Sequence, residues 1–374
     1  MNNKKITLDF TGSFHTYLSS GCKICQIGAK MVLFVTGLCN KNCFYCPISN
    51  EKKNKDVVFA NEVRVKSDQD IIKEARSMDA LGTGITGGEP LLKLNRVLHY
   101  INLLKSEFGE KHHIHLYTAI APNKNTLELL SKAGLDEIRF NPPIEATGRS
   151  VGRNNINNSK FKKSIQIAKQ LIPEVGIEIP SIHPIPEIIK LITQMDIFLN
   201  LNELEYSDTN SLQLKNKGFK LKNEVSNAVS GSEDIAKEII NTYPLNLTPY
   251  PLIHFCSSRY KDAVQLRERL KRKAKNFAKP FMEITEDGTI VYGTIENKRL
   301  EGASGANNNL DKGIKLLRKL GVPEDMFLQK PNKIEIAEWI LEDLAEELKK
   351  RNYEVAIVEQ YPMENGLIVE RIPL

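Results

Sequence analysis

The feature that most constrains this chain is a short loop with three cysteines, Cys39, Cys43 and Cys46, which directly follows an apolar run over residues 31–35. The run predicts a strand that ends where the loop begins. Three thiolates on so short a loop can converge on one metal centre, and thiolates favour zinc or the iron of an iron–sulfur cluster. A structural zinc site closes with four protein ligands. Three cysteines alone suit a four-iron cluster in which one iron stays open to a ligand that is not protein.

The spacing of these cysteines resembles the CxxxCxxC signature of the radical S-adenosylmethionine superfamily, with an aromatic residue, Tyr45, just before the third cysteine as in that family. A second motif, at residues 86–90, reads Thr-Gly-Gly-Glu-Pro and resembles the family's GGE motif at the end of the second barrel strand. The chain also looks like an uncharacterised archaeal group related to glycyl-radical-enzyme activases, of the pyruvate formate-lyase-activating type. A zinc knuckle or a coincidental cluster is the alternative, and two motifs in the family's order count against it.

Length and composition set the broad class. The chain has 374 residues, so we expect a core of about 200 residues with a smaller partner domain. Hydrophobic residues at 41% and charged residues at 26% are ordinary for a soluble globular protein. No run approaches the ~20 apolar residues of a membrane span, and the amino terminus leads into no signal segment. Six cysteines in clusters indicate metal chemistry in a reducing compartment, so we expect a cytoplasmic protein.

From residue 31 onward, strand-like runs alternate with amphipathic helical segments. The predicted strands are 31–36, 83–86, 113–118, 137–141, 175–180 and 198–204. The predicted helices are 68–80, 94–107, 124–133, 158–171 and 185–196. Such alternation implies an α/β fold in which a parallel sheet is covered by helices, and right-handed crossovers curl it into a barrel. We therefore expect a partial (β/α)6 barrel of the TIM type, with ligands at the carboxyl ends of the strands.

The expected domain boundaries follow from composition. We expect an amino-terminal segment over residues 1–29, the core barrel over 30–210, a flexible linker or lid over 211–240, and a carboxyl-terminal α+β domain over 241–374. In that last domain, a helix over residues 261–278 is strongly basic, with nine Lys or Arg against two acids between residues 259 and 279. Asp-Gly at 287–288 predicts a hairpin, and residues 334–350 predict an amphipathic helix.

The family resemblance implies roles for several residues. The three loop cysteines would bind three irons, and the fourth iron would bind S-adenosylmethionine. Gly87 and Gly88 would let the backbone approach the cofactor, Glu89 would accept from its ammonium group, and Tyr45 would pack on the adenine. The remaining implied cofactor contacts lie at strand ends, at Thr118, Asn141, Ser181 and Asn202. The sequence identifies no residue that donates or accepts hydrogen after the radical forms.

A second metal site is predicted outside the signature loop. Cys22, Cys25, His254 and Cys256 supply the Cys₃His set that closes a tetrahedral zinc site, or the thiolates of an auxiliary iron–sulfur cluster. Burial as small apolar residues is the alternative. His113 and His115 also invite a metal interpretation. Because no carboxylate or cysteine lies at ligand spacing in the sequence, we expect these two histidines to line the barrel or face solvent, with contact to the substrate as the alternative.

The sequence predicts a radical S-adenosylmethionine enzyme that cleaves its cofactor reductively at a [4Fe–4S] cluster, with electrons from a ferredoxin or flavodoxin. The basic helix favours tRNA or another RNA as substrate, with phosphates held by Arg267, Arg269, Lys271 and Arg272. The alternative is radical modification or activation of a protein or peptide. A non-catalytic metal module that binds nucleic acid is an alternative of another class, and the GGE motif counts against it.

Overall fold

The computed structural model describes residues 6–144, 159–183, 185–242, 250–297 and 307–374. The chain divides into two compact units, Met1–Leu266 and Arg267–Leu374. The division lies later in the chain than the boundary expected at residue 241. The reason is that the strand Leu252–Cys256, which lies within the expected second domain, pairs with the barrel sheet. None of the described helices is long and apolar enough to cross a membrane.

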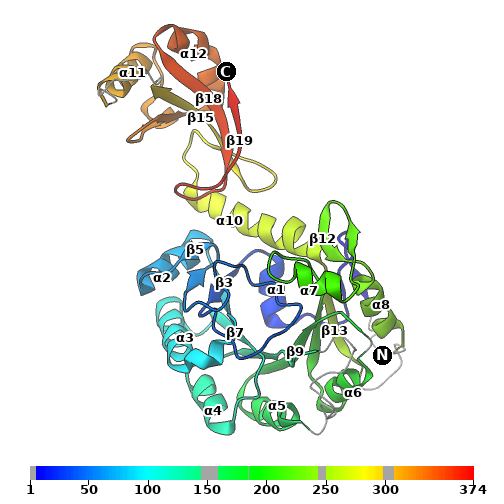
Figure 1. The fold of residues 1–374 in the computed structure, drawn as a ribbon. Coiled ribbons are helices and arrows are strands. Elements are labelled where there is room, and N and C mark those ends of the chain that lie inside the picture. The colour runs from blue at the N-terminus through cyan, green and yellow to red at the C-terminus, as the bar shows by residue number, and fades with distance from the viewer. Residues whose placement is uncertain (1–5, 145–158, 184, 243–249, 298–306) are drawn as a thin grey trace. The chain divides into compact units, whose positions relative to one another are not determined.

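The first unit is built on a sheet with seven parallel strands in series (Figure 1). In spatial order these strands are β3 (Lys30–Phe34), β6 (Gly82–Thr86), β7 (His113–Thr118), β8 (Glu137–Phe140), β9 (Glu174–Pro180), β10 (Phe198–Asn202) and β13 (Leu252–Cys256). Short antiparallel strands extend both edges: β4 (Phe59–Ala60) and β5 (Val63–Arg64) beyond β3, and β2 (Phe14–His15) and β1 (Thr7–Leu8) beyond β13. No pairing among the described strands joins the two edges, so the barrel is partial.

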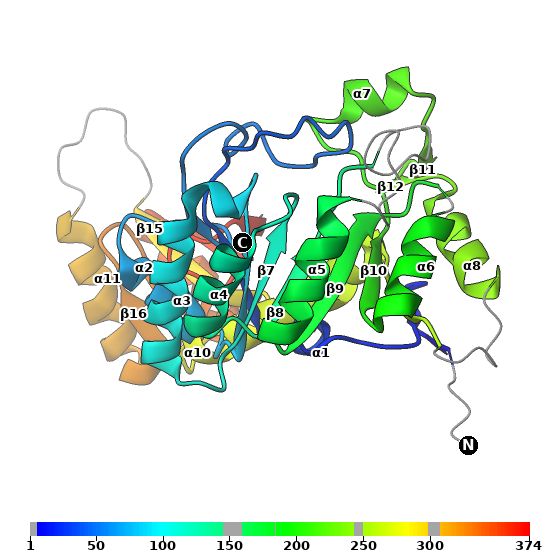
Figure 2. The same ribbon diagram turned by 90° about the horizontal axis from the view of Figure 1, so that it is seen from below.

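Helices cover the outer face of this sheet, as Figure 2 shows. They are α2 (Asp68–Ser77), α3 (Leu94–Phe108), α4 (Lys124–Lys132), α5 (Lys160–Leu171) and α6 (Pro186–Met195), with a 3₁₀ turn at Pro90–Lys93 before α3. Helix α3 shows why the periodicity was informative. Its residues Val97, Ile101 and Leu104 are fully buried in the core at helical spacing, and Gly109, with a φ of 82°, follows its last turn. A further short helix, α1 (Ser20–Gln26), contacts β3, β6 and β7.

Residues 211–240 are not the flexible linker that their composition suggested. They form α7 (Ser211–Asn216), a two-stranded ribbon of β11 (Leu221–Asn223) and β12 (Ser226–Val229), and α8 (Ser232–Thr242). The segment is fixed to the cysteine loop just before α7. The Asn210 side chain donates to the Tyr45 carbonyl oxygen at 3.2 Å, and the Thr209 hydroxyl donates to the Ile48 carbonyl oxygen at 2.7 Å. The chain is therefore held against the cysteine loop where this segment begins.

The second unit is an α+β domain. Its antiparallel sheet has the order β16 (Phe327–Gln329), β17 (Ile334–Ile336), β15 (Ile290–Asn297), β18 (Tyr353–Gln360) and β19 (Ile368–Pro373), and β14 (Glu283–Ile284) also pairs with β15. Helices α11 (Asn307–Lys319) and α12 (Glu338–Lys350) pack on this sheet. The Asp-Gly hairpin is present between β14 and β15. The helix expected from residue 334 begins later, because its first residues pair as β17.

The basic segment is helical without a break over residues 258–277, but it is not α-helical throughout. A short helix, α9 (Ser258–Tyr260), leads into a π-helical stretch at Lys261–Leu266 in the first unit, and α10 (Arg267–Phe277) begins the second unit. The unit boundary therefore falls inside the helix that the sequence predicted over residues 261–278.

Candidate active site

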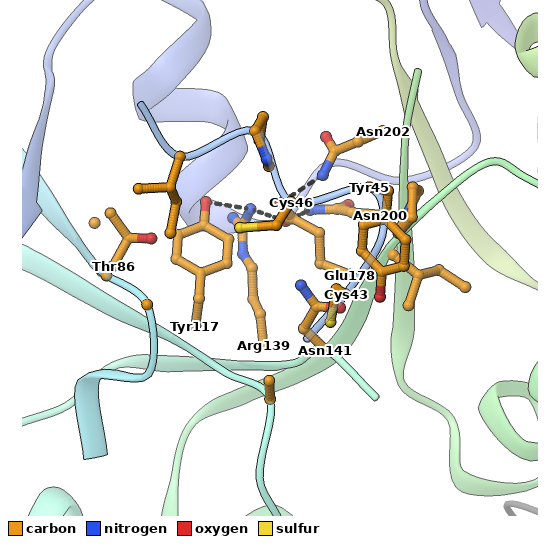
Figure 3. Close-up of a pocket in the computed structure, with 18 of the residues that line it drawn as sticks. Cys43, Tyr45, Cys46, Thr86, Tyr117, Arg139, Asn141, Glu178, Asn200 and Asn202 are labelled. Atoms are coloured by element: carbon orange, nitrogen blue, oxygen red, sulfur yellow. Dashed lines mark hydrogen bonds and ion pairs between the residues drawn. The ribbon is translucent and has the colours of Figure 1, made fainter. Parts of the chain in front are cut away.

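A cavity of about 580 Å³ opens at the carboxyl ends of the barrel strands and extends into the barrel lumen. Cys39, Cys43 and Cys46 all line it, as do Gly87 and Gly88 of the second motif. Figure 3 shows the cysteine loop beside polar side chains from the strand ends. The structure thus brings together the two motifs that are separated by 40 residues or more in the sequence.

Close backbone packing holds the two motifs against each other. The Gly88 N–H donates to the Thr36 carbonyl oxygen at 2.7 Å, and the Glu89 N–H donates to the Leu38 carbonyl oxygen at 2.8 Å. A Cβ atom at Gly88 would lie 2.5 Å from the Leu38 oxygen. Glycine at this position therefore has a steric reason, because any side chain would push the GGE turn away from the loop.

The three loop thiols fit a metal centre. They are free cysteines, each partly buried, on one loop that lines one cavity. Burial raises the pKa of Cys39 and of Cys43. A thiol with a raised pKa stays protonated in the absence of a cation, and a metal ion supplies the positive charge that stabilises the thiolate. Four irons with three cysteine ligands would leave one open coordination position facing the cavity.

The Glu89 side chain has different partners from those that the family resemblance implied. It is fully buried and does not line the cavity. Its carboxylate accepts from the Leu91 N–H at 3.1 Å, the Thr118 hydroxyl at 2.9 Å and the Ala119 N–H at 2.7 Å. Burial raises the pKa of Glu89, and these hydrogen bonds oppose that rise. The carboxylate thus fastens the GGE turn to the end of β7, and its contact with the cofactor ammonium stays a prediction.

Four of the five other residues expected to contact the cofactor line the cavity, and one does not. Tyr45, Thr118, Asn141 and Asn202 line the cavity, and the Oδ1 atom of Asn141 is buried with no hydrogen-bond partner among the described residues. An acceptor in that state fits a ligand that donates to it. Ser181 does not line the cavity. It is buried, and its carbonyl oxygen accepts from the Ser232 hydroxyl at 2.7 Å.

The cavity has a charged inner wall that the sequence did not reveal. Arg139 on β8 is the largest fully buried side chain of the described residues, and its guanidinium donates to Glu137, to Glu178 at 2.7 Å and to the Tyr117 hydroxyl at 3.1 Å. Asn202 donates to the other oxygen of Glu178 at 2.8 Å. Figure 3 shows these side chains converging from neighbouring strands.

The four residues of the predicted second metal site also line this cavity, on α1 and β13. Burial alone would raise the pKa of Cys22. Arg139 and His254 outweigh burial and lower this pKa from 9.0 to about 6. Among the described residues, however, no three of their ligand atoms lie within 4.8 Å of one another. The loop cysteines form no such group either. A site at Cys22, Cys25, His254 and Cys256 stays a prediction.

The four proposed phosphate-binding residues lie on α10 in the second unit, and all four are half-buried. Lys271 pairs with Glu268 on the same helix at 3.3 Å, and Arg267 approaches the same carboxylate at 3.8 Å. The described helix therefore neutralises part of the positive charge that the sequence count suggested.

Comparison with known proteins decides the family. A family model described as the radical SAM superfamily matches residues 33–192, and one described as a domain of unknown function (DUF8061) matches residues 288–374. The chain is 39% identical over 369 residues to the "Putative glycyl-radical enzyme activating enzyme MJ0021" of Methanocaldococcus jannaschii, a match that covers 96% of this chain and 93% of that protein. The chain belongs to the radical S-adenosylmethionine superfamily. This confirms the expected enzyme class and, with it, S-adenosylmethionine and a [4Fe–4S] cluster as cofactors. The parallel sheet confirms the partial α/β barrel.

Solved structures of radical S-adenosylmethionine enzymes resemble the chain only distantly. Methylornithine synthase (PylB) is 15% identical with a TM-score of 0.40, over 63% of this chain and 72% of that one. Native anSMEcpe with bound AdoMet is 14% identical with a TM-score of 0.42, over 69% of this chain and 72% of that one. Likenesses at this level carry no argument about the substrate.

Proposed function

We propose that this radical S-adenosylmethionine enzyme activates a protein by removing a hydrogen atom from one of its residues, with a glycine as the expected target. The observation that carries the proposal is the match to the Methanocaldococcus jannaschii protein, which is named for glycyl-radical enzyme activation and aligns along almost the whole chain. The target protein would present a short segment to the cavity. A ferredoxin or flavodoxin would supply the electron.

The residues of the cavity have roles consistent with this chemistry. Cys39, Cys43 and Cys46 would hold the cluster, and the backbone at Gly87 and Gly88 would face S-adenosylmethionine. When bound and reduced, the two cofactors supply a 5′-deoxyadenosyl radical that can take a hydrogen atom from carbon. The protein's task is to exclude water and to position the target.

The polar inner wall suits a peptide segment. Asn200 and Asn202 both donate from their amide nitrogens to Glu178, at 3.1 Å and 2.8 Å, and both line the cavity. These bonds use the nitrogen of each amide and leave its carbonyl oxygen as an acceptor for a peptide N–H. Tyr45 is fixed from both sides, because its hydroxyl accepts from the Ile144 N–H at 3.2 Å and its carbonyl oxygen accepts from Asn210. The wall of the cavity is thereby ordered before a substrate binds.

RNA as the main substrate, which the basic helix had favoured, has no support in the comparisons. The family match and the named relative concern radical enzymes and protein activation. The basic residues of α10 remain open to other roles, and we do not propose an RNA substrate.

The proposal is tested by following deuterium from glycine into 5′-deoxyadenosine. Protein extract from cells of the source organism, grown on α-deuterated glycine, is incubated anaerobically with reconstituted enzyme, reductant and S-adenosylmethionine. We expect 5′-deoxyadenosine with one added deuterium, and no such product with unlabelled extract or with the Cys43→Ala variant.

An RNA fraction from the same cells serves as the matched substrate control. Stimulation of 5′-deoxyadenosine formation by RNA, and none by protein, would contradict the proposal. Stimulation by protein without deuterium transfer would keep a protein substrate and exclude glycine as the target.

A further inference from the structure

Two histidines and a glutamate come together at the amino-terminal ends of β7 and β8, away from the cysteine loop. In the parallel register of these strands His115 pairs with Glu137, and both side chains are fully buried. His113 lies on the same face of β7, with 13% of its side chain exposed. One ligand atom from each residue lies within 4.8 Å of the other two, and no other group of three such residues does so in the described ranges. The carboxylate whose absence argued against a metal is therefore supplied by the neighbouring strand.

The imidazole nitrogens of this group are not satisfied by protein. Both ring nitrogens of His113, and Nδ1 of His115, are buried with no hydrogen-bond partner among the described residues. Leaving a buried polar atom unpaired costs about 1–3 kcal/mol, so an unpaired nitrogen on each of two neighbouring imidazoles indicates a bound species. His113 Nε2 lies 3.5 Å from Glu137 Oε2, which is too far for a strong hydrogen bond but suits two ligands of one ion.

The second nitrogen of His115 lies next to a hydroxyl that can accept its proton, and such a hydrogen bond orients a metal-bound imidazole. His115 Nε2 lies 3.2 Å from the Tyr117 hydroxyl, so donation from Nε2 would leave the Nδ1 lone pair for a metal. Glu137 divides its two oxygens in a similar way. Oε1 accepts from Arg139, whereas Oε2 accepts the Gly21 N–H at 2.9 Å and faces His113.

Glycines on facing elements keep side chains out of this space. A Cβ atom at Gly21 on α1 would lie 2.6 Å from His115 Nδ1 and 2.9 Å from Glu137 Oε2. A Cβ atom at Gly84 on β6 would lie 2.6 Å from His115 Nε2. A larger residue at either position would therefore clash with His115 or Glu137. Glu137, Asp136 and Glu174 surround His113 with negative charge, and Arg139 and Lys30 are the opposing cations.

We propose that His113, His115 and Glu137 bind a divalent transition-metal ion, with zinc as the expected occupant. Two imidazoles and a carboxylate form a known three-ligand set for zinc, and a water molecule would complete the tetrahedron. The site is separate from the predicted cluster and goes beyond the proposed function. Two residues farther along the same strands, Tyr117 and Arg139 line the active-site cavity. The metal would join β7 to β8 directly beneath these side chains and fix their positions.

The test is metal analysis of the full-length, anaerobically purified protein. We expect about one zinc per chain in addition to about four irons. His113→Gln and Glu137→Gln should lose the zinc and keep the iron. His99→Gln is the matched control, because His99 is exposed on α3, and it should keep both metals. Tyr117→Phe should keep the zinc but bind it about 10- to 100-fold more weakly in a chelator competition, because the hydroxyl that accepts from His115 Nε2 is lost.

Each other outcome has a defined meaning. Zinc that is lost in Cys256→Ser but kept in Glu137→Gln would belong to the cysteine set and overturn the proposal. If wild-type protein contains no zinc and no extra iron, and if added Co²⁺ gives no visible d–d absorption, the site does not bind a metal. Ordered water would then fill it, and the proposal would be wrong. His113 is partly exposed at the start of β7, so His113→Gln keeps the test interpretable if Glu137→Gln fails to fold; iron content and circular dichroism check folding in every variant.

Discussion

Replacing Arg139 by methionine removes the charge of the largest fully buried side chain among the described residues. Its guanidinium neutralises Glu137 and Glu178 and also donates to the Ser19 hydroxyl at 2.9 Å and the Cys22 sulfur at 3.4 Å. Methionine fills similar volume but leaves two carboxylates without a cation in the lumen. Removing one partner of a buried ion pair costs about 3–5 kcal/mol. At a urea m-value of about 3 kcal/mol/M, the unfolding midpoint should fall by about 1–2 M.

The chain offers an internal control for this measurement. Its single tryptophan, Trp339, lies on α12 in the second unit, so tryptophan fluorescence reports that unit, whereas far-UV circular dichroism is dominated by the larger first unit. Arg139→Met should shift the circular dichroism transition and leave the fluorescence transition in place. Arg76→Met removes an exposed arginine paired with Glu107, and it should cost less than about 1 kcal/mol.

The pH dependence gives a second check on the same variant. The pKa of Cys22 is about 6 in the folded chain, below its ordinary value of 9.0. Burial raises this pKa, but the positive charges of Arg139 and His254 lower it more. A lowered thiol pKa stabilises the fold at high pH, and this contribution is lost as the pH falls through about 6. The deficit of Arg139→Met should therefore be larger at pH 9.0 than at pH 6. A variant within about 1 kcal/mol of wild type at both pH values would refute the reasoning, because the carboxylates would then not depend on the guanidinium.

Further predictions concern the cofactor residues and the basic helix. Cys43→Ala should lose most cluster iron and form no 5′-deoxyadenosine with dithionite, and wild-type product formation would contradict the cluster assignment. Glu89→Gln should lower the free energy of unfolding in urea by about 1–3 kcal/mol, because an amide cannot accept from all three groups that now donate to the carboxylate. Equilibrium dialysis with S-adenosylmethionine shows whether the carboxylate also contacts the cofactor. Replacing Arg267, Arg269, Lys271 and Arg272 together by Gln should leave protein-stimulated turnover unchanged, and a flattened salt dependence of tRNA binding would instead favour RNA.

The regular part of the barrel could be predicted because its signals are local. Six of the seven parallel strands, and the helices between them, follow hydrophobic periodicity to within a few residues at each end. The seventh strand, β13, was assigned to the wrong domain. It follows a proline-rich stretch that reads as a connector, and only its pairing with β10, about 50 residues earlier, places it in the sheet. Periodicity cannot supply such a non-local pairing.

The site residues also fall into those with a local sequence signal and those without one. The cysteines and the GGE motif are contiguous in sequence, and their spacing identified them. Arg139, Glu178 and Asn200 come from three strands, and each looks like one polar residue in a buried run. Their common signal was a charged or amide residue at an inward position of a strand that should be apolar on both faces. Without the register, the sequence could not show that such residues meet in one lumen.

The register also explains how the ends of the barrel are related. Along β7 the lumen-facing residues are His113, His115 and Tyr117, and along β8 they are Glu137 and Arg139, because side chains on one face recur every second residue. An apolar layer of the same volume would stabilise the barrel at least as well as these buried charges do. Stability therefore does not account for the layer. A function does, because a metal bound by the first pair of positions would set the orientation of Tyr117 and Arg139, and those side chains form the wall against which a substrate would be held.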